Sequence, residues 1–282
     1  WSAAESLAVD LLADPGLAED EAAQAFLCLA SAQAARGALR AALATFERAE
    51  EVARGAAAPI IHQDIARRCR LMLAIVSGGV IPAPADAWAH DSSTATLITR
   101  GLRAAFARDR AGAQRLLNVV RARSRRELAW QGAGPVLLAA RIEALAGHWE
   151  EAARMLQPVA SQSVEMGEVH YPAGMSAVQW FLADAFEKLG HPDSAAVYLE
   201  LIASGPVAFY QKSQLRRGIT VPFAHRRLVL LYARMGRIED AKRHWQIFSE
   251  TVRTPDPELQ PLIAEARAAL MGALGMSRSA TR

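Results

Sequence analysis

A glycine followed five residues later by an alanine recurs along this chain, each time within a pattern typical of two helices joined by a short turn. The pairs are Gly37 and Ala42, Gly147 and Ala152, Gly190 and Ala195, and Gly236 and Ala241. Alanine is small enough to let the two helices of a hairpin approach each other closely. Repeated helix hairpins build extended binding surfaces and rarely form catalytic sites. The spacing therefore predicts an all-α protein made of stacked antiparallel hairpins.

The composition agrees with helices along most of the chain. Alanine, leucine and arginine are frequent and enter helices readily, whereas aromatic residues make up only 6%. A globular chain of 282 residues often divides into two domains, but a solenoid extends lengthwise and need not divide. The net charge of +3 is too small to indicate a polyanionic partner by itself.

Apolar residues spaced three, four and seven apart place the hairpins along the chain. We expect hairpins over residues 21–54, 94–122, 135–160, 177–203 and 222–252, and a capping helix over 258–270. The predicted organisation has four parts. These are truncated N-terminal hairpins over 1–80, a linker over 81–93, a repeat array with its capping helix over 94–270, and a flexible tail over 271–282.

Two places depart from the regular pattern. Arg108 occupies the turn of the hairpin over 94–122, where the other hairpins have glycine. The stretch 204–221 is an unusually long connection before the last hairpin. It is expected to be either a plain spacer or a segment that folds over a groove.

The chain begins with Trp1 rather than methionine, and residues 3–13 have the pattern of the second helix of a hairpin. The first helix of that hairpin would lie upstream. We therefore expect further residues before Trp1.

No secretory or membrane-spanning segment is expected. Residues 1–5 lack the basic start of a signal peptide, and the most apolar window, 71–85, is too short to cross a bilayer. Cys28 and Cys69 have no partner spacing, which indicates reduced thiols. These features favour a cytoplasmic protein without membrane insertion.

The order of small and aromatic residues on one helix, then glycine, alanine, a bulky residue and a small residue on the next, resembles the tetratricopeptide repeat. The sequence PFAHRRLVLLYARMG at 222–236, followed by DPELQP at 256–261, is more specific. It is similar to the C-terminal repeat region of bacterial serine/threonine protein kinases and related transcription activators and cyclases. The resemblance covers residues 136–270. It implies a tetratricopeptide-like α-solenoid that acts as a cytoplasmic sensory or protein-binding appendage, with the catalytic or DNA-binding domain elsewhere in the polypeptide.

No residue pattern indicates chemistry within the chain itself. The seven histidines lack helical metal-ligand spacing with a third ligand nearby. The glycines mark turns rather than a phosphate-binding loop, and no nucleophile elbow or kinase motif is found. We therefore expect no enzyme activity and no catalytic, cofactor-binding or metal-binding residue.

A partner-binding groove is expected on the first helices of the hairpins, which line the inner side of a superhelix. Its predicted residues are Arg141, Trp180, Asp184, Glu187, Arg226 and Arg234. Trp180 among alternating charges suits an anchor pocket, but packing between hairpins explains it equally well. The partner would be a protein or peptide, including the parent polypeptide's own catalytic or DNA-binding domain. Asn118 is the only asparagine, which disfavours clamping of a peptide by recurring asparagines.

Arginines cluster between positions 100 and 126, where the only acidic residue is Asp109. The predicted basic patch consists of Arg103, Arg110, Arg121, Arg123, Arg125 and Arg126. This patch supports an alternative function, a nucleic-acid-binding helical solenoid. Another interpretation is a solvated helix face whose countercharges come from neighbouring hairpins. The principal prediction is a non-catalytic protein-binding scaffold in bacterial signalling.

Overall fold

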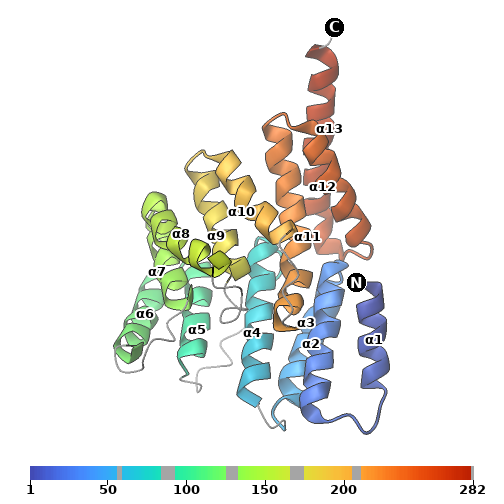
Figure 1. The fold of residues 1–282 in the computed structure, drawn as a ribbon, viewed down its shortest axis with the longest axis vertical. Coiled ribbons are helices and arrows are strands. Elements are labelled where there is room, and N and C mark those ends of the chain that lie inside the picture. Colours follow the sequence, from blue (N-terminus) through green and yellow to red (C-terminus); the bar gives the residue numbers. More distant parts are fainter. Residues whose placement is uncertain (56–58, 84–92, 125–132, 166–174, 205–210, 281–282) are drawn as a thin grey trace. The chain divides into compact units, whose positions relative to one another are not determined.

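The computed structural model describes residues 1–55, 59–83, 93–124, 133–165, 175–204 and 211–280, which form helices joined mostly by short turns (Figure 1). No strand occurs among these residues, so the predicted all-α class is confirmed. Within the same ranges, no helix combines the length and the apolar character that a bilayer crossing needs.

The chain folds into two units, one made of Trp1–Pro82 with Leu199–Arg282 and the other of Ala83–Tyr198. The first contains α1 (Ser2–Leu12), α2 (Glu19–Ala35), α3 (Leu39–Val52), α4 (Pro59–Val76), α11 (Gln211–Arg234), α12 (Ile238–Thr251), the 3-10 helix η1 (Pro257–Leu259) and α13 (Gln260–Ala280). The second contains α5 (Thr94–Phe106), α6 (Arg110–Ser124), α7 (Ala133–Leu145), α8 (Trp149–Glu165) and α9 (Met175–Lys188). The division falls within α10 (Pro192–Ser204).

Every turn glycine predicted from the sequence adopts a left-handed backbone conformation. The φ angle is 90° at Gly37, 86° at Gly147, 77° at Gly190 and 72° at Gly236. Arg108 adopts the same conformation, with a φ angle of 62°. Glycine does so without steric penalty, whereas a side chain with a Cβ atom is strained there. Arg108 therefore takes the place of a turn glycine, as the sequence predicts, at a cost in local strain.

The small residues that follow these turns are buried between helices. The alanines five positions after the turns are at most 2% exposed: Ala42, Ala113, Ala152, Ala195 and Ala241. Larger side chains at these positions would force the helices apart. Ala113 belongs to the hairpin turned by Arg108, so that hairpin follows the same packing rule.

Within the second unit, each hairpin packs against the next one along the chain (Figure 1). The helix α5 contacts α6 and α7, α6 also contacts α7, and α7 contacts α8 and α9. One core cluster of this unit contains Ala105, Ala113, Leu117, Leu138, Ala139 and Ile142. Gly101 allows α5 to approach α7, because a Cβ atom at this glycine would lie 2.5 Å from Cδ2 of Leu138.

The first unit combines helices that are far apart in the sequence. The helix α2 packs against α3 and also against α11, which in turn contacts α4 and α13. Gly218 makes the approach of α11 to α2 possible, since a Cβ atom there would lie 2.4 Å from the carbonyl oxygen of Ser31. The segment predicted as separate N-terminal hairpins, 1–80, thus shares a unit with the end of the array predicted over 94–270. Packing between distant helices decides this, and no local sequence pattern reports it.

Two segments are more helical than the sequence predicts. The connection predicted over 204–221 contains the start of α11, which begins at Gln211 and continues through Pro222. The helix α11 packs against α2, and Gly218 at this end of α11 lies close to Ser31. Such tertiary packing stabilises a helical conformation that the local sequence alone does not indicate. The flexible tail predicted over 271–282 is also helical as far as Ala280, because α13 continues without a break.

The segment between α12 and α13 lies across the turn that joins α2 to α3. The backbone amides of Thr254 and Asp256 donate hydrogen bonds to the carbonyl oxygens of Arg36 and Gly37, each at 3.0 Å. The Cγ1 atom of Val252 would lie 2.8 Å from a Cβ atom at Gly37. The turn glycine therefore serves the packing of the C-terminal segment as well as the backbone conformation.

Candidate functional site

Trp180, the predicted anchor of a peptide groove, is only 4% exposed on α9. An indole enclosed to this degree offers no ring face to an incoming peptide. The packing interpretation therefore accounts for Trp180, and a binding surface must be sought among more exposed side chains.

Arg141 lies beside Asp184, another predicted groove residue. Its Cζ atom is 5.0 Å from the centroid of the Phe181 ring, a cation–π arrangement. Burial lowers the pKa of Arg141, and the nearby Asp184 carboxylate opposes this effect. Arg141, Asp184 and Glu187 are all half-buried. The charge of Arg141 is therefore engaged within the second unit.

The other two predicted groove residues, Arg226 and Arg234, belong to α11 in the first unit. Arg226 donates from Nε to the carbonyl oxygen of Leu262 at 3.1 Å and forms an ion pair with Glu265. Burial lowers its pKa, and the Glu265 carboxylate acts in the opposite direction. Arg226 thus fastens α13 to α11, while Arg234 lies exposed in the last turn of α11.

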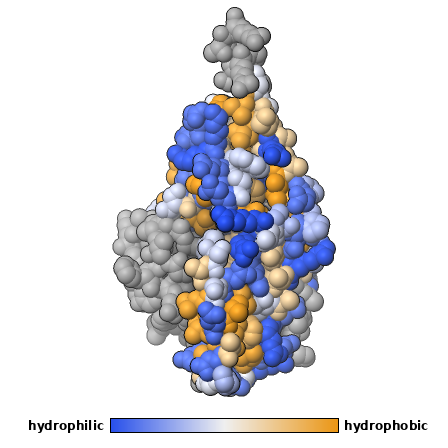
Figure 2. Space-filling model, turned by 90° about the vertical axis from the view of Figure 1, so that its right-hand side faces the viewer, coloured by the Kyte–Doolittle hydropathy of each residue, from blue (hydrophilic) through white to orange (hydrophobic). Residues whose placement is uncertain are grey.

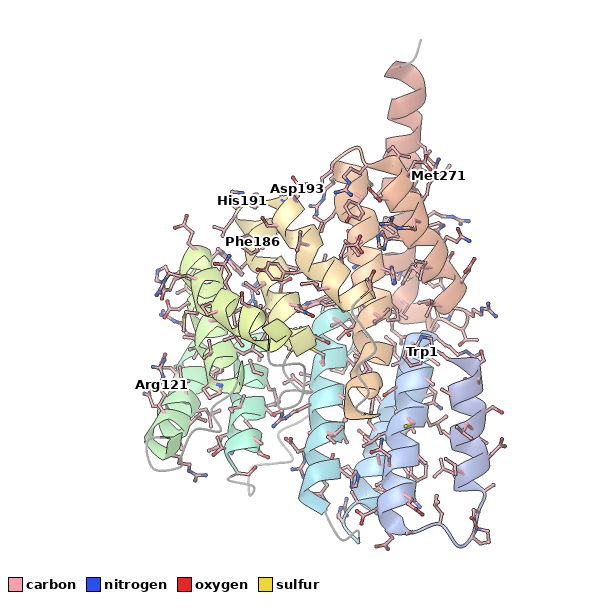
Figure 3. All side chains as sticks on the ribbon, viewed as in Figure 1. Trp1, Arg121, Phe186, His191, Asp193 and Met271 are labelled. Carbon is pink, nitrogen blue, oxygen red and sulfur yellow. The ribbon has the colours of Figure 1, made fainter. Side chains whose placement is uncertain are left out.

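The hairpin α5–α6 carries the predicted basic patch. Its exposed arginines that make no ion pair with any described residue are Arg108, Arg110, Arg115 and Arg121. Arg121, on α6, is labelled in Figure 3. Arg103 and Arg123 are half-buried, and Arg125 and Arg126 lie outside the described residues. Among the residues that the structure describes, no acidic side chain of a neighbouring hairpin therefore neutralises these exposed arginines.

A hollow of ≈ 290 Å³ opens between α5 and α6. Its polar lining comes from Arg100, Arg103, Asp109 and Arg115, and its apolar lining from Ala104, Leu116 and Val119. Val119 is 43% exposed, so its apolar side chain is open to solvent at the hollow. The hollow thus offers guanidinium groups beside an apolar surface.

Asp109 is the acidic residue of this hollow, and its carboxylate has a structural task. Its Oδ1 atom accepts a hydrogen bond from the backbone amide of Gly112 at 2.8 Å, which caps the start of α6. The Asp109 charge is therefore directed at the helix terminus, where it also interacts favourably with the helix dipole.

A buried polar network occupies the first unit, where α10, α11 and α12 meet. The Nδ1 atoms of His225 and His244 are 2.8 Å apart, and Nε2 of His244 is 2.9 Å from Oε1 of Glu200. The Tyr232 hydroxyl donates to the same carboxylate oxygen at 2.8 Å. His225 is 4% exposed and His244 2%. Sequence reasoning missed this network, because residues 19 and 44 positions apart show no shared spacing.

The network favours a neutral ring at His244. Burial lowers the pKa of His244, although the Glu200 carboxylate acts in the opposite direction. At an Nδ1–Nδ1 distance of 2.8 Å, one ring must donate a hydrogen bond and the other accept it. Burial and the Glu200 carboxylate also raise the pKa of Tyr232 to about 12. Within the described part of the chain, no group of histidine, cysteine and acidic residues is arranged to hold a metal ion.

Three apolar side chains of α1 are also exposed. Leu7 is 62% exposed, Val9 51% and Leu11 45%. Apolar patches are visible in the lower part of the face shown in Figure 2. Exposed apolar side chains in one short helix are a common feature of contact surfaces.

Comparison with protein-family models and with curated proteins found no significant match to this chain.

Proposed function

We propose that this chain is a non-catalytic, tetratricopeptide-like scaffold that binds a protein or peptide. In this proposal it serves as a sensory or regulatory appendage of a larger bacterial signalling protein, such as a kinase or a transcription regulator. The order of packing in the second unit carries the proposal. In that unit, the first helix of each hairpin contacts the first helix of the next one: α5 contacts α7, and α7 contacts α9. The second helices α6 and α8 also pack against the first helix of the following hairpin, which is α7 for α6 and α9 for α8.

This packing supports a binding role because it presents side chains at fixed intervals on a rigid framework. The turns are defined by left-handed residues and the helix crossings by buried alanines. A surface built in this way loses little conformational entropy when a partner binds. The exposed apolar residues Val119 and Leu7 add contact area of a kind that protein partners cover.

Photo-crosslinking in the source cells tests the proposal. A photoreactive amino acid at Val119 or Leu7 should capture a protein, which is then purified and titrated against the purified chain by calorimetry. Saturable binding with a defined stoichiometry is the expected result. If no captured protein binds the purified chain, the scaffold proposal is wrong.

Nucleic-acid binding is the second candidate, favoured by the exposed arginines of the α5–α6 hairpin. It predicts an affinity for oligonucleotides that falls steeply with salt concentration, because binding releases counterions from the phosphates. A protein partner bound partly through apolar contacts predicts a weaker dependence on salt. The same calorimetric titration, repeated at several salt concentrations, separates the two functions.

The role as an appendage has its own test. The complete open reading frame should encode a kinase, cyclase or DNA-binding domain in addition to these residues. Deleting the segment from that polypeptide should change the regulation of the domain while its intrinsic activity persists. An open reading frame without such a domain would leave a free-standing adaptor as the function.

A further inference from the structure

We propose that the hollow between α5 and α6 binds an acidic peptide segment that also carries an apolar side chain. This inference rests on the proposed function as a protein-binding scaffold and adds the location of the site and the chemistry of its partner. All residues that line the hollow belong to the second unit.

The charge of the hollow selects an acidic ligand. Three arginine side chains line it, those of Arg100, Arg103 and Arg115. Arg115 is exposed and makes no ion pair with any described residue, so its guanidinium is available to a carboxylate. Guanidinium groups bind carboxylates through paired hydrogen bonds that are stronger than those between neutral groups. The single acidic residue, Asp109, is turned to the start of α6 through its bond to Gly112.

The rest of the lining selects an apolar group beside the acidic one. Ala104 and Leu116 are half-buried and Val119 is 43% exposed, all three on the wall of the hollow. A leucine-sized side chain placed here would remove Val119 from water, which is favourable in proportion to the area covered. A volume of ≈ 290 Å³ accommodates one or two side chains rather than a folded domain.

A peptide fits this lining better than a nucleic acid does. Single-stranded nucleic acids are bound through aromatic side chains that stack on bases, and none of the residues that line the hollow is aromatic. A peptide, by contrast, can place one carboxylate at Arg115 and one apolar side chain at Val119.

Fluorescence anisotropy with the purified full chain tests the site. The probe is a fluorescein-labelled peptide of alternating glutamate and leucine residues. Arg115→Ala should weaken its binding about fivefold or more, since the variant removes a charge-assisted contact. Arg121→Ala is the matched control, because it removes the same charge from the same helix at an exposed position outside the hollow. Its affinity should stay within about twofold of the unmodified chain, as expected for a distant, screened charge.

A second variant tests the apolar half of the site. Val119→Ser should weaken binding of the glutamate–leucine peptide about threefold, in line with the lost apolar contact, and leave binding of oligoglutamate unchanged. Arg115 and Val119 are exposed, so thermal melts of both variants should match that of the parent chain.

Three results would overturn the inference. Equal losses in Arg115→Ala and Arg121→Ala would indicate a diffuse charge effect. Tighter binding of oligothymidylate than of the peptide would indicate a nucleic-acid surface. A captured protein partner that binds Arg115→Ala as tightly as the parent would remove the hollow as its site, while the scaffold function itself would stand.

Discussion

The carboxylate of Asp256 accepts a hydrogen bond from the backbone amide of Arg40 at 2.7 Å, across 216 positions of the sequence. Arg40 is the second residue of α3, and the residue before this helix, Ala38, has no side chain that could cap it. The amide groups at the start of a helix lack partners within it and need an outside acceptor. Asp256 supplies one from the segment between α12 and α13, and so ties the two ends of the first unit together.

Asp256→Ala should lower the free energy of unfolding by about 1 kcal/mol, the usual effect of losing a helix cap. Urea denaturation followed by circular dichroism measures this. Asp10→Ala is the control, since Asp10 is exposed on α1 and its carboxylate makes no hydrogen bond with any residue that the structure describes. Equal effects of the two substitutions would show that Asp256 does not stabilise α3.

Gly218→Ala should destabilise the first unit by about 1–3 kcal/mol, because the added methyl group meets the Ser31 carbonyl oxygen and α11 must move away from α2. Gly272→Ala provides a matched control on α13. Among the described residues, nothing outside the backbone of α13 itself lies within 4 Å of a Cβ atom there, so the substitution should stabilise the helix by about 0.5–1 kcal/mol. The prediction fails if both substitutions shift the denaturation midpoint in the same direction.

Arg108→Gly should raise the free energy of unfolding by about 1 kcal/mol, since it removes the strain of a left-handed residue that has a Cβ atom. Arg108→Ala keeps the strain while removing the charge, and should bring no such gain. The reverse experiment, Gly147→Ala, introduces strain without a steric clash and should destabilise by about 1 kcal/mol. Thermal melts of the three variants check the prediction, and a stabilising effect of Arg108→Ala would contradict it.

Acid should weaken the first unit through His244. Because burial lowers the pKa of His244, the folded chain binds its proton less readily than the unfolded chain does. The stability contributed by the neutral ring is complete above the unfolded pKa of about 6.5 and is lost as the pH falls below it. The groups facing the ring are Glu200 on α10, His225 and Tyr232 on α11, and Asp240 and Arg243 on α12.

Denaturation in urea at about pH 7 and about pH 5 measures this effect, because the two values lie on either side of the unfolded pKa. In His244→Gln the loss of stability on acidification should be smaller than in the parent chain, since the variant has no ring to protonate. An unchanged pH dependence in this variant would show that other groups are responsible.

Local sequence patterns predicted the hairpins well. The turn at Gly37 and the small residue at Ala42 interact over a few positions, and the same geometry is repeated at Arg108 and Ala113. Backbone conformation and helix contact within a hairpin are short-range effects, so spacing alone reveals them. Trp180 shows the limit of such patterns, because the sequence allowed either an open anchor or a packed residue and burial selected the second.

The sequence by itself determined that this chain is helical, where its hairpins turn, and which alanines lie between the helices. The tertiary structure alone decided that α11 extends to Gln211 against α2 and that Asp256 caps α3. It also brought His225, His244 and Glu200 together. The physical reason is the sequence separation of the interacting residues. Turn conformation and helix periodicity depend on residues that are close neighbours in the chain. Close approach at Gly218 and burial of a polar network depend on surfaces that meet only once the chain has folded.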